Sequence, residues 1–260
     1  MPVVTRFGPA PTGYLHLGHV LNAMYVWDSA RRDPGGTVLL RIEDHDRQRS
    51  RSIYEAAIVE DLDWLGFVAD APLVRQSERN AIYEDALESL RRLGLVYACE
   101  CSRSDFEGHR YPGTCRDRHL REQPGLGLRV RLDDSVVRFD DLRLGTQTQQ
   151  PFAQCGDVLV RDRDGNWTYQ FAVTVDDWAQ SVNLVIRGED LLDSTGRQIL
   201  LARLLGRTEP PAFLHHPLLM KSPTQKLSKS DGDTGIRDLR AKGWTAEQVI
   251  SSLAHLRFAT

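Results

Sequence analysis

Two histidines and a glycine near the N-terminus form the first group of residues suited to chemistry. His16, Gly18 and His19 follow a loop rich in proline and glycine, and they stand at the start of an expected helix. Two imidazoles three residues apart share one helical face, and the helix N-terminus adds a partial positive charge. Because Gly18 also lets a flat ligand come close, this group predicts a triphosphate site. The alternative is that the histidines only cap or pack the helix start.

A lysine-rich loop further along the chain forms the second group. The chain has only four lysines, and Lys221, Lys226 and Lys229 fall within nine residues, interleaved with hydroxyl side chains. A loop that closes ammonium groups onto a phosphate in the transition state is an effective catalytic device. A solvated basic loop is the other interpretation of the same residues.

Three cysteines form the third group. Cys99, Cys101 and Cys115 lie within 17 residues of one another, and the whole chain holds only 4 cysteines. A disulfide framework is typical of small, cysteine-dense secreted domains, which this chain is not. Thiolates suit zinc, so the trio predicts a zinc site that needs a fourth ligand, for which His109 and His119 are the generic candidates. Reduced structural thiols are the alternative.

A strand, a helix and a second strand must position the histidines. Residues 3–7 and 37–42 predict strands, and residues 17–32 predict a helix with one apolar face. That face consists of Val20, Leu21, Met24 and Trp27. The order predicts a βαβ unit with its loop at the helix N-terminus, so we expect a parallel sheet of the α/β class.

The rest of the chain continues this alternation around one interruption. We expect helices over 53–65, from Ser77 to Gly94, over 169–180 and over 194–205, with a strand over 184–187. Residues 97–166 change character, because they hold the cysteines, many arginines and hairpin-like strands over 128–132, 136–139 and 158–160. This segment predicts an insertion. Thr245 begins a capping-box pattern that predicts a last short helix.

The composition excludes several classes of protein. The 260 residues are 41% hydrophobic and 27% charged, which excludes a disordered or low-complexity chain. A net charge of -3 excludes a uniformly basic nucleic-acid coat, although not a basic face. There is no apolar run of membrane-spanning length and no signal-peptide pattern, so we expect a soluble cytoplasmic protein without membrane contact. Cys155 is expected to be a buried hydrophobe.

Five segments resemble signatures of the class I aminoacyl-tRNA synthetases, and of their glutamyl branch in particular. They are Arg6-Phe7-Gly8-Pro9-Ala10-Pro11-Thr12-Gly13, His16-Leu17-Gly18-His19, Arg41-Ile42-Glu43-Asp44, Val185-Ile186-Arg187-Gly188-Glu189-Asp190 and Lys226-Leu227-Ser228-Lys229-Ser230. The match covers nearly the whole chain in the order of the family. Leu17 and Leu227 replace the usual Ile and Met at similar volume, and Ala10 stands where the family often has Ser.

The resemblance implies a Rossmann-like, doubly wound catalytic core with an inserted zinc-carrying subdomain. The implied boundaries are 1–96 and 167–214 for the core, 97–166 for the insertion, and 215–260 for the lysine loop and a short helical C-terminal part. It also implies that the enzyme activates L-glutamate with ATP and Mg²⁺, and that a tyrosine supplies the fourth zinc ligand.

The resemblance assigns the site residues as follows. For glutamate they are Arg6, Phe7, Gly8, Pro9, Ala10, Glu43, Tyr169 and Arg187; for ATP they are His16, Gly18, His19 and Lys229. For catalysis they are His16, His19, Lys226 and Lys229, and for zinc they are Cys99, Cys101, Tyr111 and Cys115. We expect Arg187 to bind the side-chain carboxylate of glutamate, with Arg6 as the alternative.

Only 30 residues follow Ser230, whereas the glutamyl branch usually continues into a large part that reads the anticodon. The chain therefore resembles the short members of the branch, which load glutamate onto the queuosine base of tRNA(Asp), and we expect a monomer. The alternatives are a minimal glutamyl-tRNA synthetase, a related nucleotidyltransferase that activates another carboxylate, and a non-catalytic tRNA-binding module.

Overall fold

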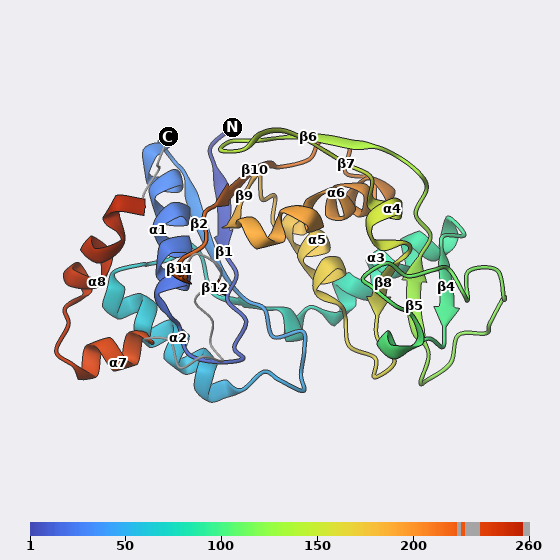
Figure 1. Ribbon diagram of the computed structural model, residues 1–260, viewed down its shortest axis with the longest axis horizontal. Coiled ribbons are helices and arrows are strands. Elements are labelled where there is room, and N and C mark those ends of the chain that lie inside the picture. The colour runs from blue at the N-terminus through green and yellow to red at the C-terminus, as the bar shows by residue number, and fades with distance from the viewer. Residues whose placement is uncertain (223–224, 227–234, 257–260) are drawn as a thin grey trace.

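The computed structural model describes residues 1–222, 225–226 and 235–256, with the backbone course only for 220–222 and 225–226. It is an elongated molecule (Figure 1). Helices α7 (Ile236–Ala241) and α8 (Ala246–Leu253) lie at one end, and the strands β4 (Val96–Cys99) and β5 (Gly127–Val130) lie at the other. A parallel sheet and its covering helices fill the space between them.

The N-terminal half of this sheet is the predicted βαβ unit. Strand β1 (Val4–Phe7) is followed by helix α1 (Leu17–Arg32) and by strand β2 (Thr37–Ile42), which pairs with β1 in parallel. The short strand β3 (Val74–Arg75) pairs with β2 in parallel. All four residues of the predicted apolar face of α1 are buried. The prediction of this unit is confirmed.

The second half of the sheet joins the first beside β1. Strands β9 (Leu184–Gly188) and β10 (Ala212–His216) pair in parallel. The backbone N–H of Asn183 donates to the carbonyl of Val4 at 3.0 Å, and the Asn183 side chain accepts from the Val4 N–H at 2.8 Å. The spatial order is therefore β3, β2, β1, β9, β10, and the direction of winding reverses between β1 and β9. In open α/β sheets, ligands bind at such a switch point, beyond the carboxyl ends of the strands.

Alternate residues of the central strands face two separate cores. Leu184 and Ile186 of β9 pack in a core with α1, α7 and α8, whereas Val185 packs in a second core with helices α5 (Tyr169–Ala179) and α6 (Thr195–Leu204). Since side chains of a strand alternate between its faces, the sheet is covered on both sides. The doubly wound fold is therefore confirmed.

The remaining helices agree with the expected pattern. Helix α2 (Ser52–Leu65) packs on the first core, and α3 (Asn80–Arg92) packs on the second. Thr245 closes the predicted capping box with Gln248 at the start of α8. Arg240 of α7 donates to the buried Asp61 of α2 at 3.0 Å, which ties the last helices to the core. Strands β11 (Met220–Ser222) and β12 (Gln225–Lys226) form an antiparallel pair.

The segment 97–166 contacts the rest of the fold in two ways, through apolar packing and through strand pairing. Strands β4, β5 and β8 (Val158–Arg161) form an antiparallel sheet whose apolar residues enter the second core. Strands β6 (Val137–Asp141) and β7 (Gly145–Gln149) form a hairpin, and β6 pairs with β10 of the central sheet. The short helix α4 (Pro151–Cys155) follows this hairpin. The hairpin thus extends the central sheet, although it lies inside the expected insertion.

Short 3₁₀ segments connect several of these elements. They cover Gln76–Glu78, Arg103–Asp105, Glu189–Ser194 and Ala254–Leu256. Within the described part of the chain, no helix has the length and apolar character needed to span a membrane.

Asp157 is a buried aspartate of the inserted segment, and it generates the first prediction. Its carboxylate accepts from Arg116 at 2.7 Å, from the Tyr97 hydroxyl at 2.7 Å and from the backbone N–H of Leu132 at 2.8 Å, and it is 1% exposed. We expect Asp157→Ala to lower the free energy of unfolding by about 3 kcal/mol, because three buried donors lose their acceptor.

Urea unfolding followed by circular dichroism measures this effect. Asp134→Ala is the control, because Asp134 is an exposed aspartate of the same segment and should change stability by less than about 0.5 kcal/mol. Equal midpoints for the two variants would show that Asp157 is not a structural anchor.

Candidate active site and metal centre

The two histidines at the start of α1 cap the helix with their own side chains. The backbone N–H of Gly18 donates to His16 Nδ1 at 3.0 Å, and the backbone N–H of His16 donates to His19 Nδ1 at 3.1 Å. The ring centroids are 3.9 Å apart. Because each Nδ1 accepts a hydrogen bond from a backbone N–H, it carries no proton, and the proton of each neutral ring lies on Nε2. Capping and ligand binding are therefore compatible, since capping turns both rings into Nε2–H donors.

A cleft of about 280 Å³ lies beside these rings. It is lined by the start of α1, by the segment after β9 and by the segment after β10, which include His16, His19, Gly188, Asp190 and His216. Gly18 also lines it, and a Cβ at that position would lie 2.8 Å from His16 Cε1. The predicted residues therefore meet at the switch point of the sheet, where an anionic ligand would reach both the histidines and the helix N-terminus.

The lysine loop can be placed only in part. The backbone of Lys226 lies in β12, opposite Met220 of β11. Lys229 lies outside the described residues. Its role therefore stays a prediction.

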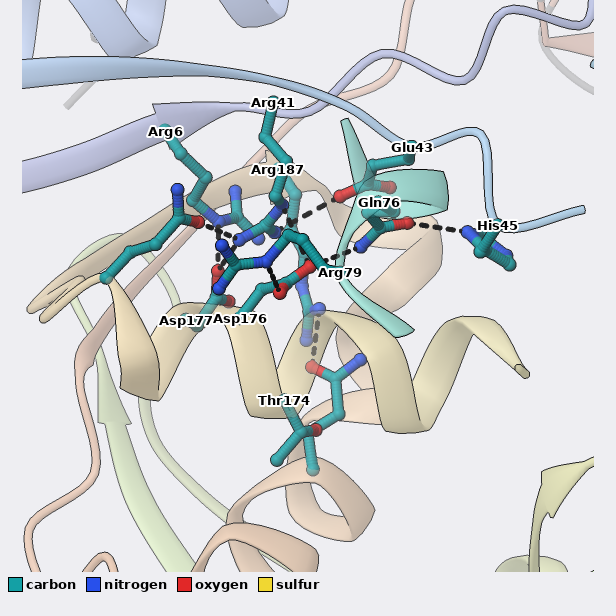
Figure 2. Close-up of polar contacts among 12 residues, drawn as sticks. Arg6, Arg41, Glu43, His45, Gln76, Arg79, Thr174, Asp176, Asp177 and Arg187 are labelled. Carbon is teal, nitrogen blue, oxygen red and sulfur yellow. Dashed lines mark hydrogen bonds and ion pairs between the residues drawn. The ribbon is translucent and has the colours of Figure 1, made fainter. Parts of the chain in front are cut away.

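A network of buried guanidinium and carboxylate groups lies at the carboxyl ends of β1, β2 and β9 (Figure 2). Arg6 of β1 and Arg41 of β2 both donate to the same oxygen of Asp177 on α5, at 3.0 and 2.8 Å. Arg41 also donates to Glu43 at 3.2 Å, and its side chain is fully buried. Asp177 thus ties three elements of the core together through one carboxylate.

The neighbouring Asp176 completes the network on the side of α3. It accepts from Gln76 at 2.8 Å, from Arg79 at 2.5 Å and from the Tyr83 hydroxyl at 2.7 Å. Gln76 in turn contacts His45 Nδ1 at 2.6 Å. These contacts anchor the loop after β2, which carries Glu43, against the helices.

The surroundings shift the pKa values of the network in opposite directions. Burial raises the pKa of Asp177, but the nearby charges of Arg6 and Arg41 outweigh it and leave the pKa below its usual range. Burial raises the pKa of Glu43, and Arg41 and Arg6 offset only part of this. Glu43 is therefore a carboxylate that gains from a further cation nearby.

Gly8 is required by its close approach to Glu43. A Cβ on Gly8 would lie 2.5 Å from Glu43 Oε1, so a larger residue would displace the carboxylate. The backbone N–H of Glu43 also donates to the Pro9 carbonyl at 3.0 Å, and Ala10 follows in the same loop. Phe7, by contrast, packs its ring into the core against Trp27 and is 1% exposed. Phe7 can therefore meet a ligand only through its backbone.

Arg187 differs from the other arginines of the network in its partners. Its Nε donates to His215 at 3.1 Å, and its Nη atoms donate to Gln198 at 2.7 Å and Thr195 at 2.8 Å. Within the described residues no carboxylate forms an ion pair with it, although it is only 3% exposed. Burial accordingly lowers its pKa below the usual range, while the partly buried Tyr169 beside it acts in the opposite direction. Arg187 is a buried cation whose direct hydrogen-bond partners among the described residues are all neutral.

Within the described residues, the network pairs every guanidinium except that of Arg187 directly with a carboxylate. Its four guanidinium groups face three carboxylates, namely Arg6, Arg41, Arg79 and Arg187 against Glu43, Asp176 and Asp177. A buried cation without an ionic partner is costly, unless a ligand supplies the anion. This arrangement favours a ligand that brings a carboxylate to Arg187.

The three cysteines of the inserted segment meet in space. The Sγ atoms of Cys99, Cys101 and Cys115 all lie within 4.8 Å of one another, and the last two are 3.6 Å apart. Two thiolates on one tetrahedral zinc ion lie about 3.8 Å apart, so the spacing fits this metal. Burial and the neighbouring thiols raise the pKa of Cys101 to about 11. A cation among the thiols would relieve this repulsion.

Tyr111 is the best-placed candidate for the fourth ligand. Its hydroxyl lies 3.4 Å from Cys99 Sγ and accepts from the Cys115 backbone N–H at 2.8 Å. His109 and His119 are both exposed, and neither lies in the cysteine cluster. The Arg129 guanidinium stacks 3.6 Å from the Tyr111 ring centroid and would offset the negative charge of a zinc–thiolate centre. Cys155 is buried and lies outside the cluster, as expected.

The sequence matches the family described as "tRNA synthetases class I (E and Q), catalytic domain" over residues 2–260. The chain belongs to this class I tRNA synthetase family. A glutamyl-Q tRNA(Asp) synthetase of Symbiobacterium thermophilum is 44% identical, over 96% of this chain and 85% of its own length. The glutamyl-Q tRNA(Asp) synthetase of Rhodobacter capsulatus is 39% identical, over 93% of this chain and 96% of its own.

Longer class I synthetases match as well. Glutamate–tRNA ligase 2 of Acidithiobacillus ferrooxidans is 41% identical over 98% of this chain, but the match covers 58% of that protein. The crystal structure of a glutamate tRNA ligase from Elizabethkingia meningosepticum in complex with its amino acid superimposes with a TM-score of 0.77 at 29% identity. The match covers 94% of this chain and 54% of that one, so the chain spans about half of the solved enzyme. The resemblance inferred from the five segments is confirmed.

Several residues of this class I synthetase site were not predicted from the sequence. Arg41 belongs to the Arg-Ile-Glu-Asp segment that carries the resemblance. The sequence predicts only that it lies in a strand, and not that its side chain binds Asp177 and Glu43. Asp177 stands beside a second aspartate on a helix, a pattern more typical of a solvated face. The pair His215-His216 was visible, but only the fold brings His215 to Arg187.

The metal centre generates the second prediction. We expect protein purified without chelator to hold one zinc ion per chain by metal analysis, and Cys101→Ser to lose it. Cys155→Ser is the matched control and should keep the metal, because Cys155 lies outside the cluster. An absence of zinc in the wild type would refute the centre. If Tyr111→Phe held zinc as firmly as the wild type under chelator competition, only the assignment of Tyr111 as the fourth ligand would be refuted.

Proposed function

We propose that this protein activates L-glutamate with ATP to form glutamyl-adenylate. The observation that carries the proposal is Arg187, a buried cation whose described partners are all neutral. An amino acid with a side-chain carboxylate supplies the missing anion. The solved ligase of the same family, bound to its amino acid, supports the same substrate class.

The network offers a partner for each charged group of glutamate. Arg187 binds the side-chain carboxylate, because its guanidinium carries N–H groups beyond the three used by His215, Gln198 and Thr195. Glu43 binds the α-ammonium, because burial raises its pKa despite Arg41 and Arg6, and a further cation would stabilise the buried carboxylate. The charges of Glu43, Arg187 and Arg6 all act on the pKa of the Tyr169 hydroxyl, so Tyr169 lies close to these three groups. Arg6 is the weaker candidate for the side-chain carboxylate, because Asp177 already neutralises it at 3.0 Å.

The chemical step follows from this arrangement. The α-carboxylate of glutamate is ionised at neutral pH, so it attacks the α-phosphorus of ATP without a general base, and pyrophosphate leaves. The Nε2–H groups of His16 and His19 donate to the triphosphate from the α1 side. Lys226 and Lys229 neutralise the charge that develops on the phosphate, and Mg²⁺ accompanies the nucleotide.

We further propose that the acceptor is the queuosine base of tRNA(Asp). The glutamyl-Q tRNA(Asp) synthetases of two organisms are similar to this chain over 85% and 96% of their own lengths. A zinc ion on Cys99, Cys101, Tyr111 and Cys115 would hold the inserted segment together. Location in the cytoplasm and a monomeric state stay predictions.

The arginine-rich stretch of the insertion is less available to RNA than its sequence indicates. Arg116 pairs with the buried Asp157, and Arg118 pairs with Glu100. Arg103 donates to backbone carbonyls of its own loop, and the Arg110 side chain stacks on Phe152. Arg116 is therefore a structural residue, and any phosphate contact falls to its more exposed neighbours such as Arg121.

The third prediction tests activation. Amino-acid-dependent pyrophosphate exchange should proceed with glutamate and not with glutamine, because a neutral amide leaves the charge of Arg187 uncompensated. Lys229→Ala should lower this exchange by about 10²–10³ while the protein stays folded. Efficient exchange with another carboxylate would favour the alternative nucleotidyltransferase. Near-wild-type exchange in folded Lys229→Ala would remove the lysine from the mechanism.

The fourth prediction tests the acceptor. Labelled glutamate should be loaded onto tRNA(Asp) that carries queuosine, and not onto tRNA(Asp) without it or onto tRNA(Glu). Binding should weaken with added salt, since phosphate contacts release counterions. Loading of the 3′ end of tRNA(Glu), with no effect of queuosine, would make the chain a minimal glutamyl-tRNA synthetase instead. If the protein formed no glutamyl-adenylate or other adenylate, a non-catalytic tRNA-binding module would be the remaining alternative.

A further inference from the structure

A buried aspartate and histidine stand behind Arg187 in a line. Arg187 Nε donates to His215 Nε2 at 3.1 Å, and His215 Nδ1 lies 2.7 Å from Asp141 Oδ2. The side chains of His215 and Asp141 are both fully buried. His215 belongs to β10, whereas Asp141 is the last residue of β6, in the hairpin of the inserted segment. Neither residue takes part in the activation chemistry described above.

The hydrogen bonds determine which nitrogen of His215 carries the proton. Arg187 Nε–H can only donate, so His215 Nε2 must accept. The proton therefore lies on Nδ1, and the Nδ1–H donates to Asp141. Burial lowers the pKa of His215 below its usual range, in agreement with a neutral ring. The histidine is thus a neutral acceptor in a fixed orientation.

Asp141 is itself held by the backbone. Its Oδ1 accepts from the N–H groups of Arg143 and Leu144 at 3.0 and 2.9 Å, and its Oδ2 also accepts from the His215 N–H at 3.1 Å. Burial raises the pKa of Asp141, but the hydrogen bond from the His215 side chain and those from the Leu144 and Arg143 N–H groups outweigh it and leave the pKa below its ordinary value. The N–H groups in the turn of the β6–β7 hairpin therefore fix the orientation of the Asp141 carboxylate.

We propose that Asp141 and His215 are positioning residues that fix the Arg187 guanidinium for the substrate's side-chain carboxylate. This inference rests on the proposed glutamate-activating function. The fixed His215, together with Thr195 and Gln198, defines the plane of the guanidinium. The negative charge of Asp141 stays one imidazole away, so it supports the cation without forming an ion pair that would compete with the substrate.

The same hairpin holds the other two partners of Arg187. Gln149 at the end of β7 accepts from the Gly196 N–H at 2.8 Å and donates to the Leu192 carbonyl at 2.9 Å. A Cβ on Gly196 would lie 2.6 Å from Gln149 Oε1, so the backbone approaches the hairpin closely. Gly196 stands next to Thr195. The hairpin therefore positions two parts of the chain: the segment with Thr195 and Gln198, through Gln149, and His215 on β10, through Asp141.

The fifth prediction compares two substitutions of His215 in the full-length protein. His215→Leu removes the acceptor of Arg187 Nε, whereas His215→Gln can place an amide oxygen near the position of Nε2. Pyrophosphate exchange should show a KM for glutamate raised about 10- to 100-fold in His215→Leu, with the KM for ATP changed less than about threefold. His215→Gln should recover most of this loss. Asp141→Asn should raise the KM for glutamate by about threefold to tenfold.

Controls separate positioning from general damage. His255→Leu replaces an exposed histidine and should leave both KM values unchanged. Melting temperatures and zinc content are measured for every variant; if His215→Leu does not fold, the comparison rests on His215→Gln and Asp141→Asn. Wild-type protein without glutamate-dependent exchange would overturn the proposed function, and this inference with it. Normal wild-type exchange, with folded variants that leave the KM for glutamate unchanged or raise both KM values equally, would overturn only the positioning role.

Discussion

The burial of charged groups at one edge of the central sheet is the constraint on which the site depends. Arg6, Arg41 and Arg187 are almost fully removed from solvent, and each needs compensation that water no longer provides. Asp177 compensates the first two at 3.0 and 2.8 Å. In the part of the chain that the structure describes, Arg187 donates only to neutral acceptors. The fold thus leaves one buried positive charge for a ligand to complete.

The topology explains why these groups meet although they are far apart in the sequence. Arg6, Arg41 and Arg187 lie on three neighbouring parallel strands, and Asp177 lies on the helix that covers them. The reversal of winding between β1 and β9 opens the cleft beside the same strands, where His16 and His19 present their Nε2–H groups. The proposed sites for an amino acid and for a triphosphate therefore adjoin, because both lie at the carboxyl ends of the same parallel strands.

Sequence patterns predicted the elements with a strong period and missed those without one. The apolar face of α1 and the capping box at Thr245 were found because their spacing is regular. Strand β7 was missed, since Gly145-Thr146-Gln147-Thr148-Gln149 has no apolar alternation and gains its order by pairing with β6. Arg6, Glu43 and Arg187 came from motif resemblance. Asp141 and Asp177 were not found, because only the folded chain shows that an ordinary aspartate is buried against an arginine.

The neutral hydrogen-bond partners of Arg187 would account for the proposed selection of glutamate better than a stronger electrostatic clamp would. A carboxylate of the protein next to Arg187 would stabilise it, but a substrate would then have to displace an existing ion pair. A neutral imidazole orients the guanidinium and leaves its charge available. A glutamate carboxylate then gains the full interaction, whereas the amide of glutamine leaves the buried cation uncompensated. Because the imidazole is held by Asp141, selection of the amino acid depends on a hairpin that lies in the inserted segment and pairs with the catalytic sheet.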